Sequence, residues 1–248
     1  MHYFIITGTS SGIGLALAQQ LLTQGYTVFA LSRRLTSPLQ KDNPNLHFIP
    51  IDLTNTEKLG EIMESIFEKI CYNETLKGIY LINNAATISP IGSIGEVQES
   101  HILSAIQVNL SAAFILTAAF IRLSQSISAT KRVISLTSGA AKTAYEGWAA
   151  YCTAKAGIDA MTQTIGLEQK RRLYPIEVLA VAPGVVDTPM QTMIRATPEQ
   201  QFPMQTKFID LYEKDALAQP DAIAERLIQL AFATDFPTGE VIDLRTYR

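Results

Sequence analysis

The sequence predicts an α/β protein: a single Rossmann-type domain with a doubly wound parallel sheet and helices on both faces of that sheet. First, short β-branched and apolar runs alternate with helix-length segments along the whole chain. This alternation is typical of βαβ units with right-handed crossovers and parallel strands. Second, strands such as Ile79–Ile82 are apolar throughout, which favours a sheet buried on both faces. Third, no Gly/Ser-rich linker, internal repeat or charge block divides the 248 residues, so we expect one domain, residues 1–248.

Seven strands are predicted, each from a short apolar run bounded by turn residues or by a helical pattern. The first, Tyr3–Thr7, leads directly into a glycine-rich turn, and the second, Tyr26–Ser32, begins immediately after Gly25. The other strands are expected at His47–Ile51, Gly78–Ile82, Arg132–Leu136, Ile176–Val181 and Glu240–Leu244.

Helices are predicted between the strands. In the first, Gly12–Gln24, the residues Ile13, Leu17 and Leu21 fall on one stripe, as expected of a helix that packs one face on a core. The remaining helices are expected at Glu57–Ile70, Glu96–Leu123, Ala149–Gln169 and Asp221–Ala233. The least regular stretch, Pro189–Asp215, is either padding for the core or a substrate lid. We expect a lid at about residues 189–215, because it follows a strand end, where open α/β sheets bind ligands.

Composition and charge exclude several classes of partner. The chain is 47% hydrophobic and 17% charged, which is ordinary for a globular protein with a sizeable core. A net charge of −3 offers no basic face to a phosphate backbone, so no nucleic-acid partner is expected. The N-terminus lacks a basic leader and a signal-peptide core. No apolar run approaches the ~20 residues that cross a bilayer, so we expect no membrane association and a cytoplasmic location.

The spacing of cysteine and histidine indicates neither a disulfide framework nor a metal site. Cys71 and Cys152 are far apart in the sequence, which fits a reducing cytoplasm. The three histidines, His2, His47 and His101, show no ligand spacing, so no metal cofactor is expected.

A glycine-rich segment, Thr7–Gly14 with the sequence TGTSSGIG, joins the first predicted strand to the first helix. Glycine permits a tight turn and lets backbone N–H groups approach a pyrophosphate, which the positive end of the helix dipole also favours. Glycines before a helix also occur in plain turns, but their place at the first strand–helix junction favours a nucleotide site.

The end of the second strand indicates which nucleotide binds. NAD sites usually carry Asp or Glu there to bind the ribose 2′-hydroxyl, whereas this chain has Ser32 followed by Arg33 and Arg34. A guanidinium can bind a 2′-phosphate through charge-assisted hydrogen bonds. The two arginines could also be a solvated surface pair; because the acid is absent and the bases are present, we expect NADP(H).

Tyr151 and Lys155 are four residues apart, so on a helix their side chains share one face. A nearby ammonium favours the phenolate and would lower the pKa of the tyrosine from ~10 toward neutrality, where it can exchange protons with an alcohol or carbonyl. Such a pair also occurs by chance on helix surfaces, so its meaning depends on the other motifs.

Together these motifs resemble the short-chain dehydrogenase/reductase family along essentially the whole chain. Its motifs are matched, in order, by the glycines of Thr7–Gly14, by Asp52, by Asn83–Ala86 (NNAA), by Asn109, by Ser138 thirteen residues before Tyr151, by Lys155, and by Pro183–Thr188 (PGVVDT). Two positions depart from the family. Ala86 replaces the usual glycine, and Ser11 stands where some NADP-dependent relatives carry a second basic residue.

The resemblance implies hydride transfer between the nicotinamide and a carbonyl or carbinol carbon. In the reducing direction Tyr151 would protonate the oxygen, Ser138 would orient it, Lys155 would bind the nicotinamide ribose, and Asn109 would support a water path. The implied cofactor contacts are Gly8, Ser10, Ser11, Gly12, Ile13, Gly14, Arg33, Arg34, Asp52, Leu53, Asn83, Ala85, Tyr151, Lys155, Pro183, Gly184, Val186 and Thr188.

Within the family the chain looks most like the benzil reductase and sepiapterin reductase branch. This likeness implies an NADPH-dependent carbonyl reductase for a small apolar or aromatic substrate, such as an α-diketone reduced at one carbonyl. The pocket is expected to be lined by Ser138, Trp148, Met190, Met193 and Phe202. The alternatives are a sepiapterin reductase, a 3-oxoacyl-carrier-protein reductase and a non-catalytic NADP(H) sensor. Relatives pair through the helices at Glu96–Leu123 and Ala149–Gln169, so a homo-dimer or tetramer is expected.

Overall fold

Parallel strands form one sheet in the computed structural model, which describes residues 1–37, 39, 42–70, 72 and 75–247. The seven strands in this part of the chain are β1 (His2–Thr7), β2 (Thr27–Ser32), β3 (Leu46–Pro50), β4 (Gly78–Asn83), β5 (Thr130–Leu136), β6 (Glu177–Ala182) and β7 (Val241–Asp243). Their order is β3-β2-β1-β4-β5-β6-β7, and neighbours are parallel. This confirms the predicted Rossmann-type fold.

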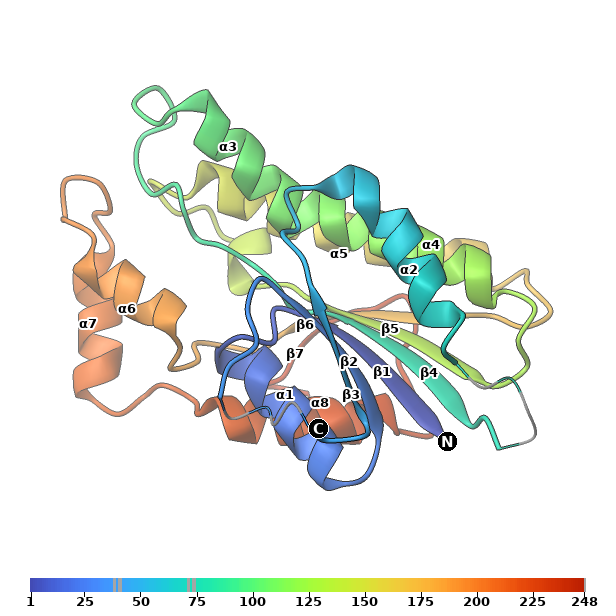
Figure 1. Cartoon of the computed structure of the whole chain (residues 1–248). Helices are drawn as coiled ribbons and strands as arrows, with labels where there is room; N and C mark the ends of the chain where they lie inside the picture. Colours follow the sequence, from blue (N-terminus) through green and yellow to red (C-terminus); the bar gives the residue numbers. More distant parts are fainter. Residues whose placement is uncertain (38, 40–41, 71, 73–74, 248) are drawn as a thin grey trace.

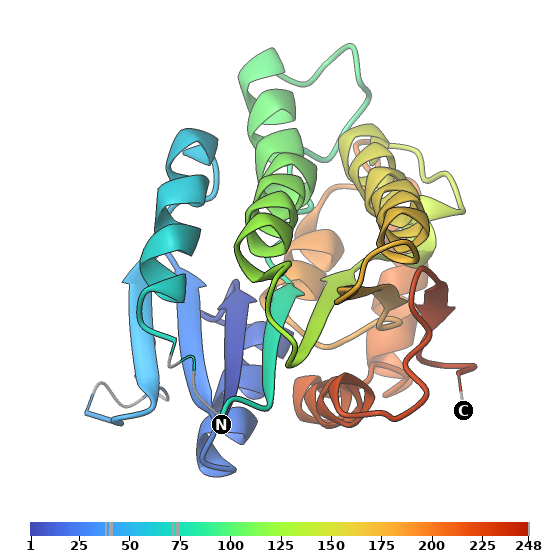
Figure 2. The ribbon, with the colours of Figure 1, turned by 90° about the vertical axis from the view of Figure 1, so that its right-hand side faces the viewer.

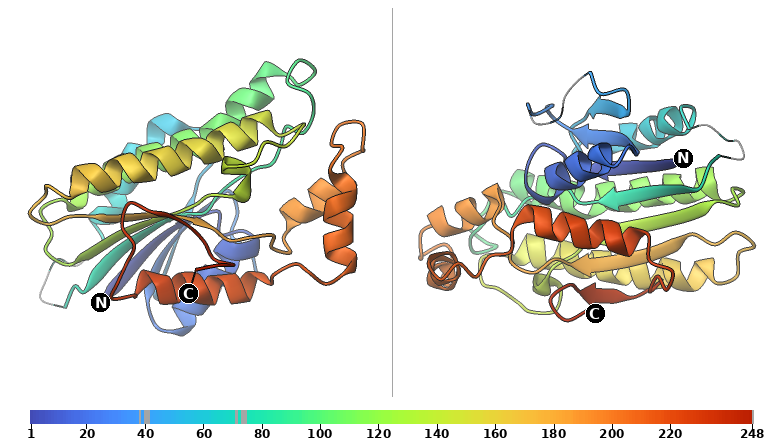
Figure 3. Two further views of the ribbon diagram at one scale, coloured as in Figure 1. Left: turned by 180° about the vertical axis from the view of Figure 1, so that it is seen from behind. Right: turned by 90° about the horizontal axis from the view of Figure 1, so that it is seen from below.

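Helices cover both faces of the sheet (Figure 1). On one face lie α1 (Gly12–Thr23) and α8 (Pro220–Ala231), and on the other lie α2 (Leu59–Phe67), α4 (Ala112–Ser124) and α5 (Ala149–Gln169), as Figure 2 and Figure 3 also show. Side chains alternate along β1, so Phe4 and Ile6 join the core beneath α1 and α8, while Tyr3 and Ile5 join the core beneath the other helices. Such alternation follows from the two-residue repeat of a strand.

The helix expected at Glu96–Leu123 is continuous but not uniform. It consists of α3 (Glu99–Ile106), a π-helical turn η2 (Gln107–Ser111) and α4. Single π-helical turns inside α-helices frequently mark functional sites. Short 3₁₀ turns, η1 (Thr56–Lys58) and η3 (Gly139–Ala141), precede α2 and α5.

The α3–α4 stretch corrects one expectation. Glu99–Ser124 is long and apolar enough, by length and composition alone, to cross a membrane, whereas no such run was expected. Its apolar residues were underestimated because polar residues such as Gln107 and Asn109 interrupt them. Leu116 and Phe120 have no exposed surface and lie in the core beneath α2 and α4. The apolar residues of the stretch are divided between this core and the surface, where Leu103 and Phe114 are 60% and 51% exposed.

Two helices occur where no regular pattern was recognised. α6 (Pro189–Ala196) and α7 (Gln205–Glu213) extend beyond the sheet at the ends of the strands, side by side. Pro189 occupies the first turn of α6, a position that its fixed φ angle favours. A third apolar cluster fastens these helices to the body of the domain: Ile88, Ala140, Trp148, Tyr151, Ile194, Phe202 and Phe208.

Two glycines allow α5 to lie directly on the chain that leads into β7. A Cβ atom built on Gly166 would lie 2.4 Å from the Cα of Gly239. Gly239 has a φ of 79° and donates its N–H to the Val178 carbonyl at 2.6 Å. No side chain fits between these two backbone segments.

Gly166→Ala should lower the free energy of unfolding by about 1–3 kcal/mol, because an added methyl group overpacks a contact between two backbones. Gly60→Ala is the matched control: Gly60 is also helical, and a Cβ there has nothing within 4 Å. It should stabilise the protein by roughly 0.5–1 kcal/mol through helix propensity. Urea denaturation of both variants measures the difference, and equal effects would contradict the packing argument.

Candidate active site

The glycine-rich segment forms a tight cradle at the carboxyl end of β1. A Cβ atom on Gly14 would lie 2.3 Å from both the Gly8 carbonyl oxygen and Asn84 Nδ2, and Gly8 and Gly12 have φ values of 74° and 56°. Ser11 precedes α1 and makes no side-chain capping hydrogen bond. The backbone N–H groups at the start of α1 are therefore free of a side-chain cap, and a phosphate group fits the cradle.

The end of β4 holds this cradle in place. Asn84 Nδ2 donates to the carbonyl oxygens of Thr7 and Gly8 at 2.8 and 3.2 Å. The backbone N–H groups of Asn84 and Ala85 both donate to the Thr7 hydroxyl at 3.0 Å. Ala85 thus lies beside the cradle.

The Pro183–Thr188 segment approaches the same cradle from β6. A Cβ on Gly12 would lie 3.0 Å from Thr188 Cγ2, so the two segments are in contact. Val185 accepts the N–H of Ala218 and Asp187 donates to the Ala218 carbonyl, both at 2.9 Å, which ties the segment to the chain ahead of α8.

The two arginines lie at the far end of the cradle. Arg33 and Arg34 are exposed, whereas the Ser32 side chain is buried and donates to the Arg34 carbonyl at 2.9 Å. Asp52 accepts hydrogen bonds from Thr54 N and Oγ1 at 3.0 and 2.8 Å. These hydrogen bonds, and then the charge of Arg33, hold the pKa of Asp52 below its usual value. Ser32 therefore shapes the turn, and Arg33 extends near Asp52.

Several predicted cofactor contacts have side chains that face away from the cradle. Ile13, Leu53 and Val186 are buried in the two sheet cores. Asn83 donates to Thr117 Oγ1 and Ser135 Oγ at 3.0 and 3.1 Å inside the core. At these four positions, only backbone atoms can meet a ligand in this arrangement.

Asn109 lies within the π-helical turn η2 and is 2% exposed. Its Oδ1 accepts the Thr87 N–H at 2.7 Å, and its Nδ2 donates to the Thr87 carbonyl at 2.8 Å. Both ends of the amide are therefore engaged by the loop after β4. The side chain positions that loop, which the sequence pattern alone did not indicate.

Ser138, Tyr151 and Lys155 meet at the start of α5. The Ser138 hydroxyl interacts with the Tyr151 hydroxyl and accepts the Ala140 N–H at 3.1 Å. Lys155 Nζ donates to the Leu136 carbonyl at 2.7 Å and lies 5.7 Å from the centroid of the Tyr151 ring. The helical spacing of Tyr151 and Lys155 thus places a phenol, a hydroxyl and an ammonium together.

The expected lowering of the tyrosine pKa does not occur in this structure. Burial raises the pKa of Tyr151 to about 12, although the Ser138 hydrogen bond lowers it. Burial also lowers the pKa of Lys155 to about 8, while the Asp159 carboxylate raises it. Desolvation outweighs the attraction expected between phenolate and ammonium, and Lys155 Nζ donates to a carbonyl oxygen. Tyr151 is therefore held as a protonated phenol, the form that donates a proton.

The predicted pocket walls pack largely on one another. The rings of Trp148 and Phe202 stack with centroids 4.7 Å apart and an interplanar angle of 4°, and Trp148 meets Tyr151 edge to face at 5.8 Å. Phe202 has no exposed surface, so in this arrangement it supports Trp148 and does not line a pocket. Met190 is partly buried at this cluster, and Met193 is 48% exposed.

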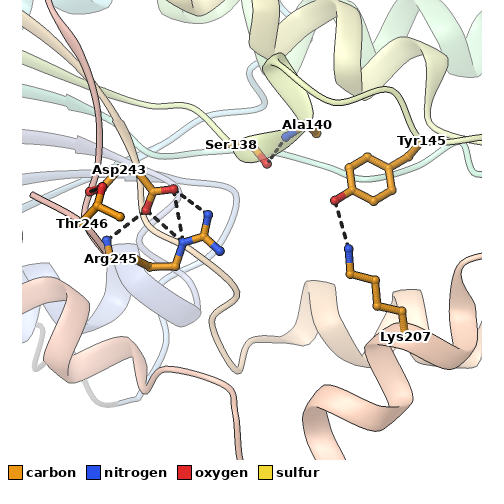
Figure 4. A network of polar contacts seen from close by, with 7 residues as sticks. All are labelled: Ser138, Ala140, Tyr145, Lys207, Asp243, Arg245 and Thr246. Atoms are coloured by element: carbon orange, nitrogen blue, oxygen red, sulfur yellow. Dashed lines mark hydrogen bonds and ion pairs between the residues drawn. The ribbon is translucent and has the colours of Figure 1, made fainter.

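A further group of polar residues lies around Ser138 (Figure 4). Figure 4 shows Arg245 beside Asp243, with Ser138 and Tyr145 across from them. Arg245 donates to Asp243 at 2.6 Å, and its aliphatic carbons cover Gly184. Lys207 Nζ, from α7, lies 3.5 Å from the Tyr145 hydroxyl. No motif marks these residues; only the position of Asp243 at a strand end was a signal.

The structure describes one of the two cysteines. Cys152 is a free cysteine, and Cys71 lies outside the described residues. Across the described ranges, no group of three or more His, Cys, Asp and Glu side chains gathers in a way that could hold a metal ion.

Comparisons with known proteins agree with this geometry. The family model described as short chain dehydrogenase matches residues 2–199. A benzil reductase ((S)-benzoin forming) from Bacillus cereus is 39% identical and covers 98% of both chains. A sepiapterin reductase from Mus musculus is 28% identical over 96% of this chain and 95% of its own. Among solved structures, the KRED1-Pglu enzyme superposes with a TM-score of 0.83 at 24% identity, covering 98% of this chain and all of that one.

Proposed function

The chain belongs to the short chain dehydrogenase family, and from that premise we propose that it is an NADPH-dependent reductase that converts one carbonyl of an aromatic α-diketone into a chiral hydroxy ketone. The observation that carries the proposal is the meeting of Ser138, a protonated Tyr151 and Lys155 at the carboxyl edge of the sheet. The full-length similarity to a benzil reductase supports the substrate class.

The glycine cradle and the arginines fit NADP(H). The cradle would hold the pyrophosphate through the N–H groups at the start of α1. Arg33 would bind the 2′-phosphate, with Arg34 next to it, since both are exposed and no carboxylate follows Ser32. Ala85 and the backbone of the Pro183–Thr188 segment would flank the nicotinamide end. When bound, NADPH supplies the hydride that reduces the carbonyl carbon.

The protein's own side chains would supply the proton and would orient the carbonyl substrate. Tyr151 donates its hydroxyl proton to the carbonyl oxygen as negative charge develops there, and Ser138 donates a hydrogen bond to the same oxygen. Lys155 lies beneath the phenol, where its ammonium favours the phenolate that remains and binds a ribose hydroxyl. Asn109 holds the loop after β4. Asn109 lies in a π-helical turn, a feature that is frequent at functional sites.

An α-diketone suits this arrangement for an electronic reason. Each carbonyl withdraws electrons from its neighbour, so the first addition is easy; once one carbonyl is reduced, the activation is lost. Reaction should stop at the hydroxy ketone. Met190 packs on the cluster that holds Trp148 and Tyr151, and Met193, on the same helix, is 48% exposed. These two side chains would offer apolar surface to flat rings.

Three other functions are less well supported. A carrier-protein reductase would need basic groups at its entrance for the acidic carrier, and only Lys142, Arg195 and Lys207 could serve. Lys142 and Lys207 are exposed, whereas Arg195 stacks on Tyr212 at 4.0 Å. A sepiapterin reductase is the main rival, through the 28% identity above. A non-catalytic NADP(H) sensor has no need of the proton donor Tyr151.

We also propose that the chain forms a homo-dimer or tetramer through α4 and α5. Phe114 on α4 and Leu167 on α5 are 51% and 65% exposed. The outer face of α5 also carries small exposed residues, such as Ala156 and Ala160, which would let a second copy approach closely. The two helices lie side by side over one face of the sheet (Figure 2). The free thiol of Cys152 supports a cytoplasmic location.

Arg33→Ala should weaken NADPH binding by roughly ten- to a hundredfold, the loss of one charge-assisted phosphate contact, with little effect on NADH. Titration of nicotinamide fluorescence measures both affinities. Arg172→Ala, an exposed arginine beyond α5, is the matched control and should change neither. Equal catalytic efficiency with NADPH and NADH in the unmodified protein would refute the cofactor assignment.

Tyr151→Phe should keep NADPH binding and lose at least ~10²–10⁴-fold in turnover, because the proton donor is removed while the ring remains. Absorbance assays of NADPH oxidation measure the turnover, and NADPH fluorescence verifies that the variant still binds the cofactor. Tyr26→Phe removes a hydroxyl near His2, at the opposite edge of the sheet, and should retain activity. Near-normal turnover of Tyr151→Phe would show that another group supplies the proton.

With benzil and NADPH, the product should be benzoin with one enantiomer dominant, and no diol should accumulate. The name of the Bacillus cereus relative points to the (S) enantiomer. Chiral chromatography identifies the product, with sepiapterin and an acetoacetyl thioester as competing substrates. A racemic product, a diol or clearly faster turnover of either competitor would count against the proposal.

Phe114→Glu and Leu167→Glu should convert the oligomer into a monomer, since a charge in an apolar interface is left unpaired. Light scattering after size-exclusion chromatography gives the mass. Leu173→Glu, at an 85% exposed site after α5, is the control and should leave the mass unchanged. A monomeric unmodified protein at micromolar concentration would overturn the oligomer proposal.

A further inference from the structure

Asp159 lies one helical turn after Lys155 on α5, and no motif drew attention to it. Residues four apart on a helix share a face, and helical side chains lean toward the N-terminus. The Asp159 side chain therefore leans toward Lys155. Its Oδ1 atom is buried and has no hydrogen-bond partner in the structure. A buried carboxylate oxygen without a partner is costly unless a cation compensates for it.

The surroundings of Asp159 connect it to the candidate site. The Thr137 hydroxyl donates to the Lys155 carbonyl at 3.3 Å. Its single proton can turn to the Asp159 carboxylate instead, which partly offsets the burial that raises the pKa of Asp159. Thr137 directly precedes Ser138 and is 3% exposed. The carboxylate thus lies behind Lys155, under the segment that carries Ser138.

Few other charges face this pair. The titratable groups on α5 and on the elements packed against it include Lys142 after η3 and Asp243 on β7. The others are Tyr151, Cys152, Lys155 and Glu168 on α5 itself, Glu99 and His101 on α3, Arg122 on α4, and Lys131 and Arg132 on β5. Lys142 attracts Asp159, and Asp243 interacts with Lys142. Glu177 on β6 is paired with Arg132 at 2.7 Å. On the described elements, Asp159 is thus the anion that acts on the Lys155 ammonium.

We propose that Asp159 is a positioning residue for the reductase reaction: its carboxylate keeps Lys155 charged, and therefore able to serve Tyr151 and the nicotinamide ribose. The inference rests on the proposed function and adds a residue to its machinery. Without Asp159, Lys155 would be a fully buried amine with no anion beside it, and the neutral form would prevail at a lower pH.

The direction of the pH effect follows from the two groups. Burial lowers the pKa of Lys155 to about 8, and Asp159 opposes that change. The pKa of Tyr151 is raised to about 12, so the phenol stays protonated throughout the working range. Loss of activity on the alkaline side therefore follows Lys155 as it loses its proton, and removing Asp159 must move that loss to lower pH.

The test is a pH profile of Asp159→Asn from about pH 6 to about pH 10, a range that spans the Lys155 titration. Two quantities are measured: kcat/KM for a reduced carbonyl, and the Kd of NADPH by fluorescence. The alkaline limb of both should shift down by about one pH unit, as expected for loss of a nearby opposite charge. Asp159→Ser removes the same charge and must shift the alkaline limb of both profiles in the same direction.

Two controls separate charge from structure. Asp159→Glu keeps the carboxylate and should restore the alkaline limb. Glu64→Gln removes an exposed carboxylate paired with Arg122 on α4, and should leave both profiles unchanged. An unmoved limb in Asp159→Asn, or an equal shift in Asp159→Glu, would overturn the inference. If no carbonyl compound is reduced, the proposed function fails, while the NADPH profile still decides the role of Asp159.

Discussion

The shape of the glycine cradle depends on the contact between the carboxyl ends of β1 and β4. The Asn84 amide donates to the carbonyls of Thr7 and Gly8, and the Thr7 hydroxyl accepts two N–H groups in return. A Cβ at Gly14 would displace that amide, so the Asn84 hydrogen bonds can form only with a glycine at position 14. Because the cradle is closed in this way, its N–H groups have one fixed direction, and the segments from β6 can pack against it.

Much of the fold followed from the sequence because parallel sheets leave a clear signal. Buried strands such as β4 are apolar throughout, and α5 shows an unbroken helical pattern; its ends match the expected Ala149–Gln169. The junction of β1 and α1 was equally clear, since glycines are required where a backbone turns this tightly. The positions of Tyr151 and Lys155 on one helical face followed from their spacing alone.

Other features depend on contacts that no local pattern encodes. α6 and α7 are short, and their apolar residues face a cluster made by distant segments. The role of Arg245 depends on β7 pairing with β6, which brings it over Gly184. The Tyr151 pKa could not be judged from spacing, because burial in the folded protein raises it. The amide of Asn109 is likewise engaged by Thr87, a contact between two elements.

The packing of Arg245 over Gly184 has a consequence for synthesis of the protein. The glycine cradle belongs to the first residues made by the ribosome, whereas the Pro183–Thr188 segment is covered at Gly184 by Arg245, which follows β7. A nascent chain with only β1–β5 therefore has one half of the ligand site and exposes the β5 edge where β6 will pair. Such an edge is a template for wrong association. Contacts between distant parts of the chain, such as that of Gly12 with Thr188, also slow folding, so the site is completed only after the last strand has been made.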